Sequence, residues 1–415
     1  MQSNLIQNRW KSVLLIVFAA LGILGLLGRG TFLIVQGAAT FSVMAFQASS
    51  DLAGNVLDAL SMVFCALLLV PVIAYNLRAL QGRTLPAITV PPIRFWQAAV
   101  LGVVWLLIAV VGSILSSLFT YGWVVLAVFF PLGVALPIAF LVWIGLGGLP
   151  TGSVRRLWAV FGLAMAGSTV LALLAEYLVV GAGALVGWAA LLAHPEWRDV
   201  IQQLQTQVTQ ASDMQTVLSV LAPYLTNPFI VLVILVFASG IGPLIEEAAK
   251  PAAIWLVGRH LRSPSEGFAL GVLCGAGFAL LEGVTAASGF SQMWGVGMAG
   301  RAASSLMHIM ASGLVGWGIA SARLEKRFLR LGGAYLGAVC LHGLWNGAVV
   351  LAVYGAARWI LAKGPSDLLS IVFIGTGVGL LCLLLLLILV ALPVANRFLR
   401  PVPAAPQAAA GQIDV

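Results

Sequence analysis

Six side chains in the second half of the chain can act as acids, bases, ligands or hydrogen-bond donors: Glu246, Glu247, Glu282, His308, His342 and Asn346. They stand in long apolar segments, where an ionisable side chain costs roughly 2.5 to 3.5 kcal/mol at the bilayer centre. A membrane helix keeps such residues where they face a partner, a cavity or a reaction. Carboxylates and imidazoles can take a proton from water, and an amide can donate to an oxyanion. We therefore expect the six to form one site.

The first pair of carboxylates stands in the segment IGPLIEEAAKP. Glu246 and Lys250 are four residues apart and can pair on one helix face. Glu247 points about 100° away and is expected to remain free for another partner. Gly240, Gly242 and Pro243 lie just upstream and predict a loosened or kinked helix that opens onto a water-filled cavity.

The next two segments bring a carboxylate and an imidazole. Glu282 has no basic residue within one helical turn, so its partner must come from another helix. Gly271 and Gly275 predict a small-residue face on the same segment, against which a second helix can pack closely. The following segment carries a polar stripe with a spacing of three or four residues, formed by Arg301, Ser304, His308 and Ser312.

The last pair, His342 and Asn346, is four residues apart and shares one helix face. The midpoints of the four segments fall within about four residues, or roughly 6 Å, of Glu246, Glu282, His308 and His342. The side chains are therefore expected at one depth. No Ser or Cys stands beside a base in this set, which disfavours a covalent nucleophile.

The elements that hold these residues are membrane helices. Of 415 residues, 61% are hydrophobic and 8% are charged, against about 25% charged in a soluble domain. The sequence predicts an all-α polytopic bundle of about ten transmembrane helices. The expected spans are 12–35, 55–76, 96–118, 122–146, 157–179, 228–257, 267–290, 301–322, 331–354 and 368–392.

Basic residues predict the orientation of this bundle. With the N-terminus in the cytoplasm, 16 of the 21 Lys and Arg residues fall on the cytoplasmic side. Both termini are then cytoplasmic, and the net charge of +8 reflects topology and anionic lipid rather than nucleic acid. We expect a multi-pass protein of the plasma membrane, of bacterial origin. The lipid bilayer and a membrane-anchored protein substrate are the expected partners.

The segments group into five regions: an N-terminal five-span region (1–193), an extracytoplasmic amphipathic connector (194–227), a catalytic four-helix core (228–354), a C-terminal transmembrane helix (355–400) and a disordered cytoplasmic tail (401–415). In the N-terminal region, the acidic residues within spans are Asp58 and Glu176, near span edges. We therefore expect this region to control access or stability rather than chemistry.

Four ordered motifs, E-E-x-x-K, G-F-A-x-x-E, R-x6-H-x3-S and H-x-x-W-N, resemble the PrsW family of glutamic-type intramembrane proteases, which are distant relatives of the CAAX prenyl endopeptidases. The resemblance covers roughly residues 235–350. Gly283 follows Glu282 where the family usually has Asn. The resemblance implies cleavage of membrane-bound protein substrates, such as an anti-sigma factor.

The residues support a compatible mechanism. Glu246 or Glu247 would be the general base, His308 would orient the water or move the proton, and His342 with Asn346 would donate to the oxyanion. We expect no cofactor, although two His and two or three Glu residues can also ligate Zn²⁺. An ion- or proton-coupled transporter and a non-enzymatic membrane scaffold are the alternatives, and the absence of visible internal repeats disfavours transport.

Overall fold

The computed structural model describes residues 2–43, 48–83, 85–118, 122–210, 214–257, 261–285, 294–361 and 367–401. The described chain is an all-α bundle apart from one short pair of strands. It contains ten helical segments long and apolar enough to cross a membrane, so the predicted polytopic architecture is confirmed. The predicted disordered tail lies outside the described residues, except for Pro401.

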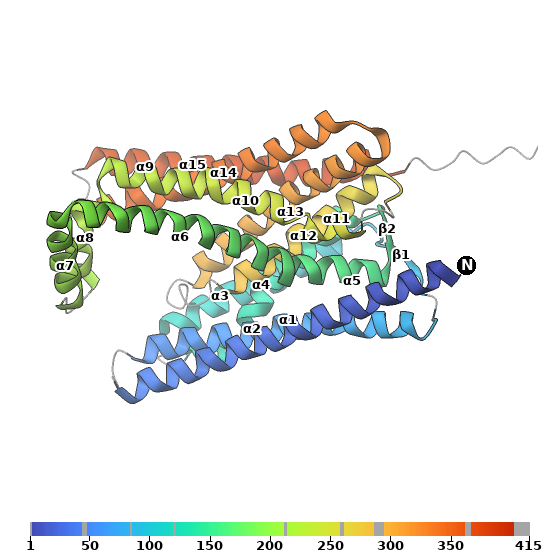
Figure 1. Ribbon diagram of the computed structural model, residues 1–415, viewed down its shortest axis with the longest axis horizontal. Coiled ribbons are helices and arrows are strands. Elements are labelled where there is room, and N and C mark those ends of the chain that lie inside the picture. Colours follow the sequence, from blue (N-terminus) through green and yellow to red (C-terminus); the bar gives the residue numbers. More distant parts are fainter. Residues whose placement is uncertain are drawn as a thin grey trace, which may run out of the picture.

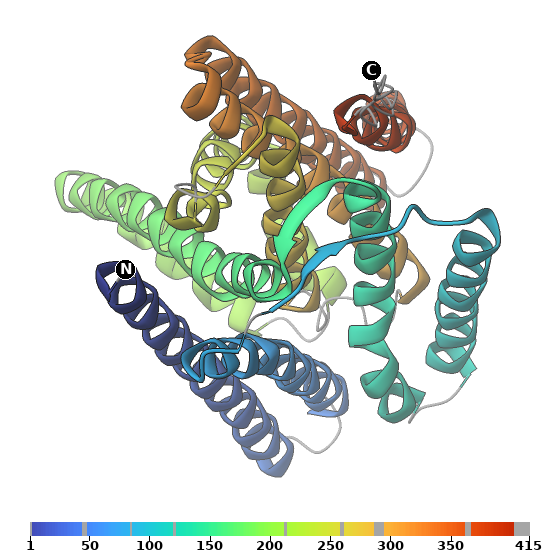
Figure 2. The same cartoon turned by 90° about the vertical axis from the view of Figure 1, so that its right-hand side faces the viewer.

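The first four spans form one side of the bundle, with α1 and α2 packed together as a long pair (Figure 1). Two strands at one end, here called the hairpin end, pair antiparallel and hold the segments before α3 and after α4 together. Figure 2 looks onto this end. The elements are α1 (Gln2–Val43), α2 (Ala48–Leu80), β1 (Ala87–Thr89), α3 (Phe95–Leu118), α4 (Gly122–Leu146) and β2 (Pro150–Ser153).

The fifth span is longer than the sequence predicted. It runs through a π-helical turn and continues to Ala193, 14 residues beyond the expected end at 179, so Glu176 lies well inside it. Two further helices follow at the opposite end of the bundle, here called the connector end (Figure 1). The elements are α5 (Val154–Gly162), η1 (Leu163–Ser168), α6 (Thr169–Ala193), α7 (Pro195–Gln210) and α8 (Met214–Leu225).

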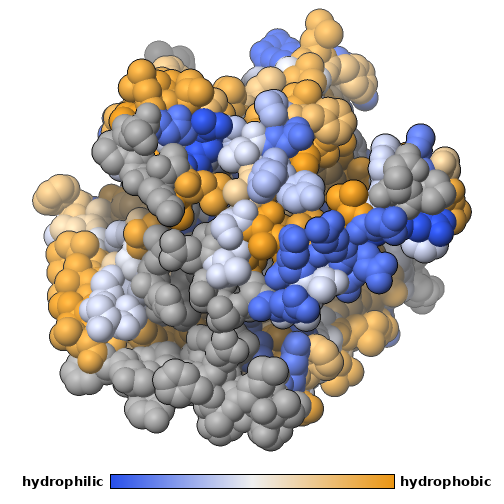
Figure 3. All heavy atoms as spheres, turned by 90° about the vertical axis from the view of Figure 1, so that its left-hand side faces the viewer, coloured by the Kyte–Doolittle hydropathy of each residue, from blue (hydrophilic) through white to orange (hydrophobic). Residues whose placement is uncertain are grey.

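The face at the connector end carries a patch of hydrophilic side chains among hydrophobic ones (Figure 3). Exposed glutamines of α7, including Gln202, Gln203 and Gln205, are part of the polar surface of this connector. Leu204 and Val208, four residues apart, are less exposed than their polar neighbours.

The second half of the chain surrounds the site. Its first span is interrupted twice, by a π-helical turn at the predicted kink and by Lys250 and Pro251. The following helices are continuous. The elements are α9 (Pro228–Val236), η2 (Phe237–Ile241), α10 (Gly242–Ala249), α11 (Ala252–Val257), α12 (Pro264–Thr285), α13 (Trp294–Glu325), α14 (Phe328–Leu361) and α15 (Leu368–Leu399).

Helix α12 lies at the centre of the bundle, where every residue from Ser265 to Val284 except Glu282 is buried. Its small-residue face packs on the backbone of α13, as predicted. A Cβ on Gly271 would lie 2.2 Å from the carbonyl oxygen of Ser312, and one on Gly275 would lie 2.4 Å from that of His308. Such close backbone contact needs glycine. It fixes α13, and with it His308, directly against α12.

Candidate active site

The side chain of Lys250 lies at the centre of the site. It is fully buried, at the point where Pro251 ends α10. Its Nζ lies 2.5 Å from Oε1 of Glu247 and 3.1 Å from Oε2 of Glu246. Nδ1 of His308 lies 2.8 Å from the same Nζ, and Nδ1 of His342 lies 3.5 Å from it. One lysine therefore connects both carboxylates of the doublet to α13.

Glu247 is buried and is not free of Lys250, contrary to the sequence expectation. Residues three apart also approach each other on a helix, and Glu247 makes the shorter of the two ion pairs with Lys250. Its Oε1 also lies 2.9 Å from Nδ1 of His342 on α14. Because a carboxylate only accepts hydrogen bonds, this contact assigns the His342 proton to Nδ1 and leaves Nε2 as an acceptor.

Glu282 finds its partners on α13, as predicted. Its Oε1 lies 3.1 Å from a terminal nitrogen of Arg301, and its Oε2 lies 2.8 Å from Nε2 of His308. Nδ1 of His308 accepts from Lys250, so the ring proton is assigned to Nε2, facing Glu282. In the polar stripe, Ser304 donates to the carbonyl oxygen of Arg301 within the helix. Glu282 thus orients the His308 ring.

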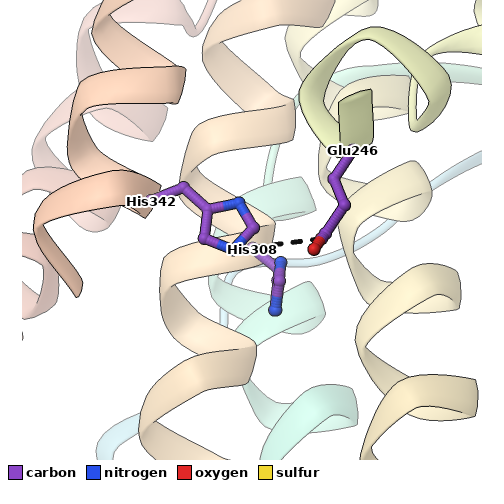
Figure 4. Close-up of side chains that lie close together, drawn as sticks. All are labelled: Glu246, His308 and His342. Atoms are coloured by element: carbon purple, nitrogen blue, oxygen red, sulfur yellow. Dashed lines mark ion pairs between the residues drawn. The ribbon is translucent and has the colours of Figure 1, made fainter. Parts of the chain in front are cut away.

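Glu246 is the more accessible carboxylate of the doublet, because 16% of its side chain is exposed and none of Glu247 is. Its Oε2, which also pairs with Lys250, lies 3.9 Å from Nε2 of His342, a distance too long for a hydrogen bond (Figure 4). The rings of His308 and His342 meet edge to face, with centroids 4.9 Å apart. Glu246 and the two imidazoles face one common space.

Asn346 shares its helix with His342 but makes a different contact. Its Nδ2 donates to the carbonyl oxygen of Ala238 at 2.9 Å, inside the π-helical turn η2. Gly343 lies between them in sequence, and a Cβ there would be 2.2 Å from the carbonyl oxygen of Ser239. Helix α14 therefore packs directly on η2, and Asn346 satisfies a carbonyl that the π turn leaves unpaired.

One group of residues fits a metal ion by type. Glu246, His308 and His342 each offer a ligand atom, and these atoms lie within 4.8 Å of one another. Two imidazoles and a carboxylate are a common set for catalytic zinc, with a fourth position open to water. Glu282 supplies the carboxylate behind a ligating histidine that such sites use. Lys250 competes for two of these residues, so an ion there requires its ammonium to move.

Sequence reasoning did not anticipate that Glu176 of α6 comes close to this site. A Cβ on Gly242 would lie 4.0 Å from Oε1 of Glu176. Its carboxylate lies near enough to the carboxylates of Glu246 and Glu282 to be repelled by them, and near enough to Lys250 and His342 to be attracted by them. The available signal was a carboxylate in an apolar stretch that continues well beyond 179. The fifth span therefore takes part in the surroundings of the site.

Gly283, the residue after Glu282, lies against α4. A Cβ at this position would be 2.8 Å from Cγ1 of Val134 and 3.6 Å from Cδ of Arg301. Contacts under about 3 Å require one of the groups to shift. The packing of α4 on α12 thus accounts for glycine after Glu282 in this chain.

The fold and the site together define a polytopic membrane protein with buried carboxylates and imidazoles at its centre. A profile of the PrsW family intramembrane metalloproteases matches residues 153–378, more than half of the chain. The chain therefore belongs to this family and is an intramembrane protease. The match begins at α5, so the fifth span lies inside the family region. No curated protein and no solved structure matches the chain.

Proposed function

We propose that this protein hydrolyses peptide bonds of membrane-anchored proteins with a water molecule that Glu246 activates. The exposed fraction of Glu246 beside the fully buried Glu247 carries this proposal, because a general base must reach the water it deprotonates. We expect Nε2 of His342, which lies 3.9 Å from Oε2 of Glu246, to accept a hydrogen bond from the same water. Membership of a protease family favours this function over transport or a scaffold role.

The remaining residues of the site hold the general base and the two histidine rings in position. Glu247 and Lys250 fix the His342 ring and the Glu246 carboxylate, and Glu282 fixes the His308 ring. Asn346 keeps one amide hydrogen beyond the one given to Ala238, and this hydrogen is our candidate for oxyanion stabilisation. Protonated Glu246 returns its proton to the leaving amine, so each turnover restores the carboxylate.

A metal ion is compatible with the same residues. Glu246, His308 and His342 would hold it, and it would supply Lewis-acid polarisation of the attacking water. Metal analysis of purified protein, followed by activity after chelation and after Zn²⁺ is added back, separates the two routes. Activity that survives complete removal of metal supports Glu246 alone. Loss that only a divalent ion restores assigns the water to the metal.

For the substrate, the cellular location and the orientation in the membrane, we keep the expectations from the sequence. We propose a plasma-membrane location in a bacterium, both termini in the cytoplasm and an anti-sigma factor or similar regulator as substrate. The described start of α1 and end of α15 lie at the hairpin end with many of the basic residues, which supports this orientation (Figure 2).

The decisive experiment compares new protein termini in membranes that contain the wild-type chain or the Glu246→Gln variant. Glu325→Gln is the matched control, because this carboxylate lies at the end of α13 in a surface pair with Arg330. We expect termini inside membrane-spanning segments with wild type and the control, and not with Glu246→Gln. Identical sets of termini in all three samples would contradict the proposed function.

A further inference from the structure

Glu176 reaches the site from α6 through a specific packing contact. Ala172, Ala249 and Phe278 form a small buried cluster between α6, α10 and α12. Glu176 is one turn after Ala172 on the same face of α6. It lies beside Gly242, which is seven residues before Ala249. The two helices thus run in opposite directions, and Glu176 lies next to α10 on the connector side of Glu246.

The charges around this position do not balance. Four carboxylates, of Glu176, Glu246, Glu247 and Glu282, interact with two cationic side chains, of Lys250 and Arg301. Lys250 and Arg301 pair with the other three carboxylates. Within the part of the chain that the structure describes, Glu176 has no hydrogen bond or ion pair. A partly exposed carboxylate with no hydrogen bond or ion pair among the described residues is able to pair with a cation that comes from outside the protein.

We propose that Glu176 is a specificity-determining residue that binds a basic side chain of the substrate close to the cleaved bond. The inference rests on the proposed function, in which Glu246 acts at that bond. Gly242 and Glu246 are one helical turn, about 6 Å, apart. An extended peptide advances about 3.3 Å per residue. The basic residue therefore stands about two positions from the cleaved bond, toward the connector end of the bundle.

This arrangement also explains how a charged residue is accepted inside the membrane. A lysine or arginine in a transmembrane segment is costly in lipid. The same residue is stabilised when it meets the excess negative charge of the site, so binding favours substrates that carry it. Glu176 acts by an ion pair alone, without a bond being made or broken.

The test uses single-span reporter proteins built on a segment that wild-type membranes cleave. The reporters are identical except for Lys, Gln or Glu at the second position on either side of the cleaved bond. Each is incubated with wild type, Glu176→Gln, Glu176→Lys and the control Glu325→Gln in proteoliposomes. The measured quantity is the ratio of kcat/KM for the Lys and Gln reporters.

We expect wild type and the Glu325→Gln control to prefer the Lys reporter by about tenfold, as for one partly desolvated ion pair. Glu176→Gln keeps the shape of the side chain and should bring the ratio to about one. Glu176→Lys should prefer the Glu reporter. Thermal unfolding of each variant shows whether the fold is intact, and the ratio of two reporters cancels any loss of active protein.

One result would overturn the proposal: an equal Lys-to-Gln ratio in wild type and Glu176→Gln, whatever its value. If Zn²⁺ binding is also at least tenfold weaker in Glu176→Gln, the carboxylate is assigned to a metal instead. A failure of wild type to cleave any membrane segment is a different outcome, and it contradicts the proposed function itself.

Discussion

Nζ of Lys250 lies 2.8 Å from Nδ1 of His308, although the two residues come from different helices and are 58 positions apart. A protonated lysine has only donors, so His308 accepts at Nδ1 and keeps its proton on Nε2, toward Glu282. The buried ammonium thus sets the tautomer of an imidazole. It also holds both carboxylates of the doublet, so changes at Lys250 act on the whole site.

Removal of Lys250 alone should destabilise the protein strongly. Lys250→Met leaves Glu247 buried without its cation, and breaking a buried pair costs about 3 to 5 kcal/mol. In the double variant Lys250→Met with Glu247→Gln, the unpaired charge is gone and much of this loss should be recovered. Thermal unfolding in detergent measures both. Equal destabilisation of the single and double variants would show that the pair is not the cause.

The same double variant should bind Zn²⁺ more tightly than wild type. The ammonium of Lys250 contacts Glu246 and His308, two of the three candidate ligands, and its removal frees both. Equilibrium binding of Zn²⁺ to purified protein gives the affinity. Adding His342→Ala to this variant is the control and should weaken binding by at least tenfold. An affinity that is the same with and without His342 would place the ion elsewhere.

Substitutions of the two carboxylates of the doublet should differ in their effects on activity and on stability. Glu246→Gln should abolish turnover and leave the unfolding temperature near that of wild type, because part of this side chain is exposed. Glu247→Gln should lower both, because this buried side chain binds Lys250 and His342. Activity on a cleaved reporter and thermal unfolding are measured for each. Full activity of Glu246→Gln would exclude it as the base.

Contact between α12 and α13 should tolerate no added methyl group at its centre. Gly271→Ala places a Cβ 2.2 Å from a backbone oxygen that a side-chain rotation cannot move. We expect a loss of stability of about 3 kcal/mol or more, at or above the usual range for overpacking. Gly332→Ala on α14 is the matched control, since nothing lies within 4 Å of its Cβ. Similar unfolding temperatures for the two variants would argue against close packing there.

Asn346→Ala should reduce kcat by about 10²- to 10³-fold if its second amide hydrogen serves the oxyanion. The variant also loses the hydrogen bond to Ala238, which contributes about 1 kcal/mol. Measurements of kcat, KM and stability separate the two roles. A loss of stability with unchanged kcat would leave Asn346 a purely structural role in holding η2.

The sequence predicted the spans and the convergence of the site because both follow from local patterns. Long apolar runs specify the helices, and Glu282 lacks any local partner, so its pairing with α13 could be inferred. The glycine spacing on α12 likewise predicted close packing. Each of these is a property of one segment or of two neighbouring segments.

The remaining features depend on helix distortion and on distant packing. Glu247 turned toward Lys250 as well as His342, which spacing alone did not decide. Asn346 found a backbone carbonyl that is free only because η2 is π-helical. Glu176 came close to the site because α6 continues past its expected end and packs on α10. The spacing of Glu247 and Lys250 and the long apolar run after Glu176 are visible in single segments, but which contacts they lead to depends on how distant helices pack.

The π-helical turn η2 also determines which way the helix after it faces. A π turn holds about one residue more than an α-helical turn, so it rotates everything after it by roughly 100°. This extra residue sets the rotation of α10 relative to α9. It allows α9 to face the lipid while the carboxylates of α10 face inward. Deletion of one residue within 237–241 would turn both glutamates away from the histidines while leaving every side chain of the site in the sequence.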